Sequence, residues 1–246
     1  MGEKIFRFKR NKDIESQLTW KEAREQNKIG VWVRNYILET LIVALVVVVI
    51  ICFVKTFLVK GWFHIPSGSM ENTLQVNDQV MVNVAETYFK DPERGDIVVF
   101  KDSQGWMPPV NYEHNPINDG LIFIGLAPDT SVNYLVKRVI GVPGDTVESD
   151  GKGKIRVNGT EVDEPYIYSG ANPSDVPFKV KVPEGKYFMM GDHRNKSADS
   201  RFHIADGKTF VQKEDILGPV FVIVAPADRA QFVGDADSSF RNVPNP

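Results

Sequence analysis

The ten residues from Ile65 to Leu74 read IPSGSMENTL, and the interpretation of the whole chain depends on them. Ser67 and Ser69 flank Gly68, and a proline precedes them. Such a run favours a tight turn that can present a hydroxyl group. A serine hydroxyl is a weak nucleophile until a neighbouring base takes its proton. The turn therefore predicts a serine nucleophile, provided that the fold brings a base to it.

A strongly apolar run precedes this turn. Leu41 to Val54 reads LIVALVVVVIICFV, fourteen residues without a charge. Extending the run to residues 36–59 gives twenty-four residues, which exceeds the ~20 needed to cross a bilayer. We expect residues 36–59 to be a transmembrane anchor. A cleavable signal peptide and a buried core helix are alternatives, but no small-residue cleavage pattern follows and the run has no polar face.

The two sides of this anchor differ in charge. Residues 1–35 carry nine Lys/Arg and five Asp/Glu, whereas residues 36–246 carry twenty and twenty-seven. Because basic flanks stay in the cytoplasm, we expect a cytoplasmic basic tail at 1–35 and an extracytoplasmic domain at 60–246. That domain has no dense basic patch, which argues against nucleic acid as a partner. The single cysteine, Cys52, excludes a disulfide framework and a cysteine-based metal site.

The outer domain is expected to be mostly β. Short β-branched runs alternate with turn residues, at 79–84, 96–100, 135–140, 154–157, 178–182, 187–190 and 220–224. Asn158-Gly159 predicts a type I′ hairpin. Segment 102–133 is expected to be an extended hairpin or a lid. The apolar Leu121 to Ile124 within it is expected to be a buried strand unless it contacts lipid. Residues 235–246 are expected to be a loose tail.

Two kinds of base are open for Ser69. A histidine would complete a Ser-His-Asp triad, with His64 and His193 as candidates, but no G-x-S-x-G elbow supports it. The alternative is Lys137, whose apolar strand neighbours would lower its pKa by desolvation. Strand alternation would place Lys137 and Arg138 on opposite faces. From residue types alone, both are more often solvated surface charges, because lysines are mostly exposed.

Four patterns follow one another behind the anchor. They are Pro66-Ser67-Gly68-Ser69-Met70 with Thr73-Leu74, then Arg94-Gly95-Asp96-Ile97-Val98-Val99-Phe100, then KRVIGVPGD at 137–145, and finally Gly191-Asp192 with Ser197-Ala198-Asp199-Ser200-Arg201. In this order they resemble type I signal peptidase, a bacterial membrane-bound serine protease. The resemblance extends to about residue 224 and implies an antiparallel β-sheet catalytic domain preceded by a single N-terminal transmembrane helix.

The resemblance implies roles for the matching residues. Ser69 would attack the scissile carbonyl and a neutral Lys137 would take its proton. The backbone amide of Ser69 and the hydroxyl of Ser67 would form the oxyanion hole. The supporting residues would orient the lysine, keep the backbone beside it small, and shape the surrounding loop; they are Ser197, Gly191, Asp199 and Arg201.

The resemblance also implies a substrate. The family cleaves exported preproteins after an Ala-x-Ala pattern, which requires a shallow apolar pocket. By position, its lining would be Ile65, Pro66, Met70, Leu74, Val80, Leu135 and Val136. No cofactor and no metal are implied. The partners would be secretory preproteins, the lipid bilayer and the secretion channel, and the enzyme would be single-pass in the bacterial cytoplasmic membrane. Trp62, Phe63, Trp106 or residues 121–124 would contact the lipid.

Three positions depart from the family pattern. His193 and Lys196 stand where asparagine is common, and Leu135 stands where some members have an aromatic residue. We expect Lys196 to add a positive charge that lowers the pKa of Lys137. The short span between the third and fourth patterns indicates the compact branch without an inserted second domain.

Two other functions stay open. A tethered β domain that binds a partner without cleaving it would need only the scaffold. A self-cleaving Ser-Lys repressor shares the dyad, but it requires a DNA-binding module and has no anchor. Metal-dependent hydrolysis is not indicated, because no His/Asp/Glu cluster has ligand spacing.

Overall fold

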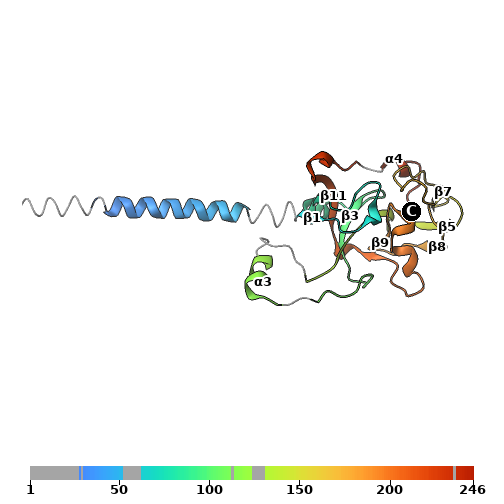
Figure 1. Ribbon diagram of the computed structural model, residues 1–246, viewed down its shortest axis with the longest axis horizontal. Helices are drawn as coiled ribbons and strands as arrows, with labels where there is room; N and C mark the ends of the chain where they lie inside the picture. Colours follow the sequence, from blue (N-terminus) through green and yellow to red (C-terminus); the bar gives the residue numbers. More distant parts are fainter. Residues whose placement is uncertain (1–27, 29, 52–61, 112–113, 124–130, 235–236) are drawn as a thin grey trace, which may run out of the picture. The chain divides into compact units, whose positions relative to one another are not determined.

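A computed structural model describes residues 28, 30–51, 62–111, 114–123, 131–234 and 237–246 (Figure 1). The chain divides into two compact units, residues 1–51 and 52–246. The first contains one long helix and the second contains all the strands that are described. The predicted fold class, a mostly antiparallel sheet behind one N-terminal apolar helix, is confirmed.

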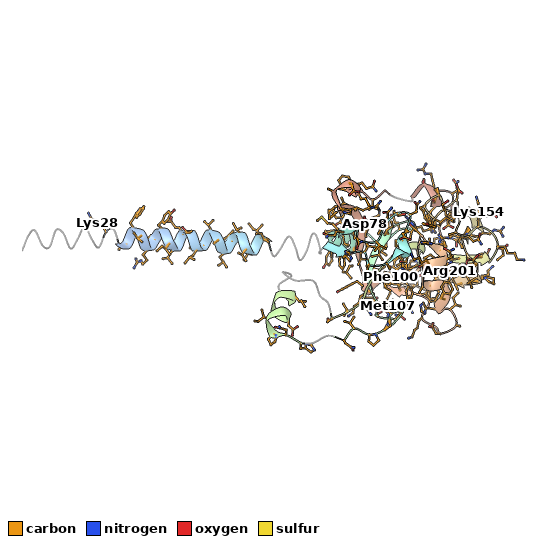
Figure 2. All side chains as sticks on the ribbon, viewed as in Figure 1. Lys28, Asp78, Phe100, Met107, Lys154 and Arg201 are labelled. Atoms are coloured by element: carbon orange, nitrogen blue, oxygen red, sulfur yellow. The ribbon has the colours of Figure 1, made fainter. Side chains whose placement is uncertain are left out.

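The helix of the first unit spans Gly30–Ile51, 22 residues with a mean hydropathy of 2.2. Every residue in it is exposed, and its side chains project from it all round (Figure 2). By length and composition it can cross a bilayer. It begins six residues before the predicted anchor, and residues 52–59 of that anchor lie outside the described part of the chain.

The larger sheet of the second unit is antiparallel throughout, in the order β1-β2-β11-β3-β4-β9-β10, with β12 paired to β11. Its strands are β1 Trp62–His64, β2 Gln79–Val82, β3 Ile97–Lys101, β4 Tyr134–Gly141, β9 Lys186–Met190, β10 Val211–Gln212, β11 Ile216–Ala225 and β12 Gln231–Phe232. Each of the seven predicted runs overlaps a strand of this sheet or of the smaller one.

The smaller sheet has the order β7-β6-β5-β8. Its strands are β5 Thr146–Asp150, β6 Arg156–Val157, β7 Thr160–Glu161 and β8 Pro177–Lys181. Asn158 and Gly159 join β6 to β7 with φ of 50° and 79°. Positive φ at both central residues is what a type I′ turn requires, so the predicted hairpin is confirmed.

Strand β11 joins two parts of the larger sheet. Its first half pairs with β3, Pro219 opposite Val98, and its second half pairs with β2, Ala225 opposite Gln79. The strand passes close to a neighbouring backbone at Gly218, where a Cβ would come within 2.5 Å of the carbonyl oxygen of Asn83. Only glycine allows that approach.

Short helices connect the strands. They are η1 Gly68–Met70, α2 Val84–Phe89, α3 Pro116–Phe123, η2 Arg194–Lys196, η3 Ser200–His203, η4 Lys213–Asp215, η5 Ala227–Arg229 and α4 Asp237–Phe240. Residues 121–123 therefore belong to a helix, so both the hairpin and the strand predicted there are wrong. The apolar run was too short to separate strand from helix.

Three apolar clusters form the core. The first lies under η1, β2 and β11 and includes Met70 and Leu74; the second surrounds Phe100 and Tyr187. Trp106, a predicted lipid contact, is only 9% exposed in this second cluster, so that prediction is wrong. Its indole instead packs edge-on against Phe100.

The third cluster lies on the smaller sheet and includes two residues from the end of the chain. Phe240 and Val243 are 4% and 8% exposed there. The backbone oxygen of Pro244 accepts hydrogen bonds from Arg94 and Asn158. The prediction of a loose tail is wrong for residues 237–246, because its two apolar side chains complete this core.

Candidate active site

The stretch from Ser67 to Leu74 folds as a tight turn. Ser67 is extended and η1 follows at once. The backbone N–H of Leu74 donates to the oxygen of Met70 at 2.8 Å, and both side chains are at most 1% exposed. Burial of these two apolar side chains anchors the turn in the core. Ser69 is thereby held at a fixed place, with 9% of its surface exposed.

Lys137 comes to this turn from the middle of β4, opposite Val98 of β3. Its Nζ lies 2.8 Å from Ser69 Oγ and donates to the oxygen of Val136 at 3.1 Å. Lys137 is 3% exposed and Arg138 2%, so neither is a solvated surface charge. The oxygen Ser67 Oγ lies 3.4 Å from Ser69 Oγ.

Burial lowers the pKa of Lys137 to about 8, because a charged ammonium loses its hydration there. The carboxylates of Asp199 and Asp192 oppose this effect, and the guanidinium of Arg201 adds to it. The nearby cation that helps to lower the pKa is thus Arg201. Lys196 is 59% exposed and pairs with Glu71 instead. A lysine with a pKa near neutral can act as a base.

Two buried ion pairs surround the lysine. Arg201 Nε donates to Asp199 Oδ1 at 2.8 Å, and Asp199 Oδ2 accepts from the backbone N–H of Gly191 at 3.0 Å. Arg138 binds Asp192 through two nitrogens at 2.8 and 2.6 Å. These charges are almost fully enclosed, and their partners satisfy them. They fix the loop after β9 against β4.

Gly191 stands where the backbone of that loop touches the turn. A Cβ there would come within 2.5 Å of the carbonyl oxygen of Ser69 and 2.6 Å of Ser197 Cβ. Real side chains do not approach so closely, so only glycine lets the loop and the turn meet. Ser197 is 5% exposed, and its hydroxyl has no hydrogen-bond partner among the described residues.

The predicted pocket residues divide into three groups. Most of them belong to the cluster beneath η1; these are Ile65, Met70, Leu74, Val80 and Val136. Leu135 packs against the neighbouring cluster, and Pro66 is exposed. The structure therefore brings five of the seven predicted residues together below Ser69, although these five mainly form core.

No contact in the described residues supports a histidine as the base for Ser69. Among the described residues, Ser69 Oγ has hydrogen bonds to Lys137 and Ser67 and to no histidine. His64 is exposed on β1, and the imidazole of His193 contacts Glu71. The geometry places an amine, not an imidazole, next to the hydroxyl.

A protein-family model described as "Signal peptidase, peptidase S26" matches residues 36–225. The chain belongs to this family. The probable signal peptidase I-2 of Synechocystis sp. is 36% identical over 74% of this chain and 70% of the relative. The probable signal peptidase I of Mycobacterium leprae is 31% identical over 83% and 82%. These matches identify the chain as a type I signal peptidase, a peptide hydrolase.

Among solved structures, the signal peptidase I of Enterococcus faecalis V583 aligns with 53% of this chain and 97% of its own. The two are 26% identical with a TM-score of 0.35, which is too low to carry an argument about the fold. The fold of the peptidase stands on the strand pairings described above.

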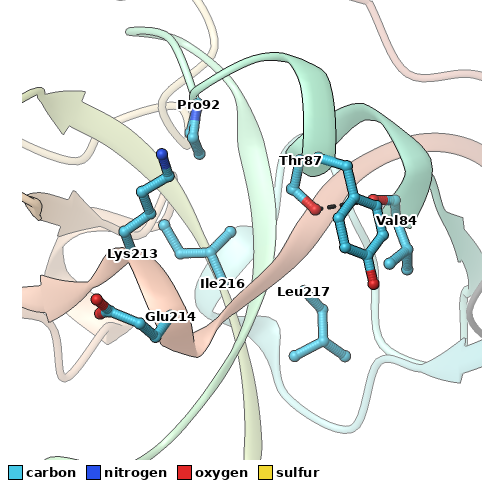
Figure 3. Close-up of a pocket in the computed structure, with 8 residues that line it drawn as sticks. Val84, Thr87, Pro92, Lys213, Glu214, Ile216 and Leu217 are labelled. Atoms are coloured by element: carbon cyan, nitrogen blue, oxygen red, sulfur yellow. Dashed lines mark hydrogen bonds between the residues drawn. The ribbon is translucent and has the colours of Figure 1, made fainter.

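A separate pocket of about 570 Å³ lies between α2 and the start of β11 (Figure 3). It is lined by Val84, Thr87, Tyr88, Pro92, Lys213, Glu214, Ile216 and Leu217. None of these residues was predicted to belong to the active site of the peptidase, and among the described residues none has a side-chain hydrogen bond to Ser69 or Lys137. The pocket is therefore no part of the catalytic arrangement.

Sequence reasoning missed two contacts of the peptidase. The pairing of Arg138 with Asp192 had a usable signal, since Arg138 lies inside one predicted strand, Asp192 follows another, and opposite charges on paired strands attract. The contact between Glu71 and His193 joins residues 122 positions apart and had no signal of that kind.

Proposed function

We propose that this peptidase removes N-terminal signal peptides from exported preproteins, cleaving after Ala-x-Ala-like sites with a Ser69–Lys137 dyad. The observation that carries the proposal is the 2.8 Å separation of Lys137 Nζ and Ser69 Oγ in a buried setting. A hydroxyl and an amine at hydrogen-bond distance satisfy the geometry for proton transfer. The lowered pKa of Lys137 supplies a fraction of neutral amine near pH 7.

Acylation begins when neutral Lys137 takes the proton of Ser69 and the oxygen attacks the scissile carbonyl. The developing oxyanion accepts hydrogen bonds from the Ser69 backbone N–H and the Ser67 hydroxyl. The lysine ammonium then gives its proton to the leaving amine. A water molecule, activated by the same lysine, hydrolyses the acyl-enzyme and releases Ser69.

The supporting residues act on the lysine. Ser197 has a buried hydroxyl without a partner among the described residues, and we assign it to the Lys137 amine, which has N–H groups to donate. Asp199 and Arg201 hold the loop that carries Ser197. The apolar residues around Met70 and Val136 would form the floor for the small side chains of the substrate.

The location follows from the helix and its flanks. We propose that Gly30–Ile51 is part of a single-pass anchor with the N-terminus in the cytoplasm and the β domain on the outer face. Protease added to intact spheroplasts should then digest the β domain and spare the N-terminal tail. Association with the secretion channel is a further prediction, which site-specific cross-linking in membranes would test.

The central experiment is cleavage of a preprotein with an Ala-x-Ala site by the full chain in detergent. Ser69→Ala and Lys137→Ala should each lower kcat by at least about a thousandfold. The controls Ser169→Ala and Lys152→Ala change exposed residues of the same types and should leave the rate unchanged. Activity that survives in Lys137→Ala would contradict the dyad. A wild type without activity on several such substrates would favour a tethered binding domain.

The pH dependence distinguishes the two kinds of base. Only neutral Lys137 can accept the proton, so kcat/KM should rise with pH and level off above a midpoint near pH 8. A histidine base would place the midpoint at roughly pH 6.5. Initial rates measured from pH 5.5 to 9.5 decide between them.

A further inference from the structure

The acidic residue that follows the nucleophile turn is folded back against it. A Cβ on Gly68 would come within 2.6 Å of the carboxyl carbon of Glu71, so the carboxylate occupies space that only glycine leaves open. The backbone N–H of Glu71 donates to the oxygen of Gly68 at 3.2 Å. The side chain is 24% exposed. The carboxylate therefore packs directly against the turn that presents Ser69.

His193 holds both the turn and this carboxylate. Its Nδ1 lies 3.0 Å from Glu71 Oε2, and its backbone N–H donates to the carbonyl oxygen of Ser69 at 3.0 Å. Tyr168 stacks on the imidazole with ring centroids 3.9 Å apart and planes 9° apart. Stacking and partial burial fix the plane of the ring. One residue thus bonds the main chain of Ser69 and the side chain of Glu71.

The charges around the carboxylate also matter. The proposed oxyanion hole lies in the same turn, and an unpaired carboxylate beside it would oppose negative charge on the substrate. His193 Nδ1 at 3.0 Å and Lys196 Nζ at 3.5 Å lie on the carboxylate of Glu71. His193 is 12% exposed and Lys196 59%, so the histidine is the better enclosed partner. We therefore expect His193 to stabilise the Glu71 carboxylate more than Lys196 does.

We propose that Glu71 and His193 form a positioning pair that fixes the turn carrying Ser69 against the loop after β9. The proposal rests on the function proposed above and names two further residues on which the rate depends. Neither side chain bonds Ser69 Oγ or Lys137 Nζ in the described contacts, so both act through the main chain of the turn. Fixing that turn aligns the nucleophile and the oxyanion amide, which affects the chemical step more than substrate binding.

Kinetics of the full chain in detergent test the pair. Glu71→Ala and His193→Ala should each lower kcat by about tenfold to a hundredfold, the usual value of a charge-assisted hydrogen bond, and leave KM within about twofold. The double variant should be no slower than the worse single variant, because both lose the same contact. His193→Asn should recover most of the rate, since its amide can donate in place of Nδ1–H.

The matched control is Glu161→Ala, which removes the same side chain from an exposed pair on the smaller sheet and should leave kcat unchanged. The pH midpoint should also stay near 8 in Glu71→Ala, because Lys137 responds to Asp199, Asp192 and Arg201. If a variant were slow because the whole domain is destabilised, its thermal unfolding midpoint would fall below that of wild type. Single variants that keep kcat within about twofold, or losses that multiply in the double variant, would overturn the pair.

Hydrogen exchange provides a readout that does not depend on cleavage. Backbone amides of residues 67–74 should exchange faster in Glu71→Ala and His193→Ala than in wild type, and at the wild-type rate in Glu161→Ala. Unchanged exchange in both variants would overturn the positioning role. If wild type and Ser69→Ala are equally inactive, the proposed function fails, and the exchange result still decides whether the pair fixes the turn.

Discussion

The active site and the smaller sheet use charge in opposite ways. Beside the active site, Arg201 and Asp199 form an ion pair with side chains 2% and 0% exposed. On the smaller sheet, Arg156 and Glu161 form one with side chains 53% and 54% exposed. A buried pair contributes little net stability but is costly to break, whereas an exposed pair contributes little either way. Buried charge therefore fixes the geometry around Ser69 and Lys137. The strands of the smaller sheet carry exposed pairs and depend on apolar packing, turn residues and the buried Asp145 that bonds Asn158 at their edge.

The largest difference should appear when one partner of each pair is removed. Asp199→Ala leaves the guanidinium of Arg201 buried without its carboxylate, which should lower the free energy of unfolding by about 3–5 kcal/mol. Glu161→Ala should cost less than about 1 kcal/mol. Chemical denaturation of the full chain, followed by circular dichroism, measures both. Equal losses would show that burial does not distinguish the two regions.

Glycines give a second comparison. Gly191→Ala puts a methyl group into the backbone oxygen of Ser69, so it should destabilise the domain by about 1–3 kcal/mol and abolish cleavage. Gly153 lies in the turn before β6, where the nearest atom to a Cβ is Asp150 Oδ1 at 3.5 Å, an ordinary contact. Gly153→Ala should change the stability by less than about 1 kcal/mol. Normal cleavage by Gly191→Ala would show that the close approach of residue 191 to Ser69 is not required for activity.

Replacement of the buried lysine should change stability in the opposite direction. The pKa of folded Lys137, about 8, lies below the value of about 10.4 in an unfolded chain. The unfolded chain therefore binds more protons between these values, and burial of this lysine costs stability most below pH 8. Lys137→Met should stabilise the protein by about 1–3 kcal/mol at pH 6. The gain should shrink as pH rises from 8 to 10, and a gain independent of pH would contradict the low pKa.

Local sequence signals were sufficient for much of the sheet. Asn158-Gly159 specified its hairpin because few residues accept positive φ, and apolar alternation located the long strands. Helix α3 was missed although Asn115 precedes it and Pro116 is its first residue. The side chain of Asn115 accepts from the backbone N–H of Ile117, and proline suits a first helical position. The prediction relied instead on the apolar run from Leu121 to Ile124, which is too short to distinguish a strand from a helix.

Local sequence signals predicted less of the candidate site. The burial of Lys137 depends on strands from distant parts of the sequence, so residue types alone favoured a surface charge, and only the family resemblance pointed to Lys137 as the proposed base. The packing of Phe240 and Val243 on the smaller sheet was missed for the same reason, because their partners lie far away in the sequence. Tertiary contacts across more than sixty positions, such as that of Lys137 with Ser69, are not encoded in local periodicity.

Strand β11 also constrains when the domain can form. It lies between β2 and β3 in the larger sheet, yet it is made near the end of the chain, at residues 216–225. In a growing polypeptide that has not reached residue 216, no strand pairs β1–β2 with the part of the sheet formed by β3, β4, β9 and β10. The turn that carries Ser69 and the strand that carries Lys137 belong to different parts of the sheet. The proposed dyad is therefore not held in place by the complete sheet until β11 has been synthesised.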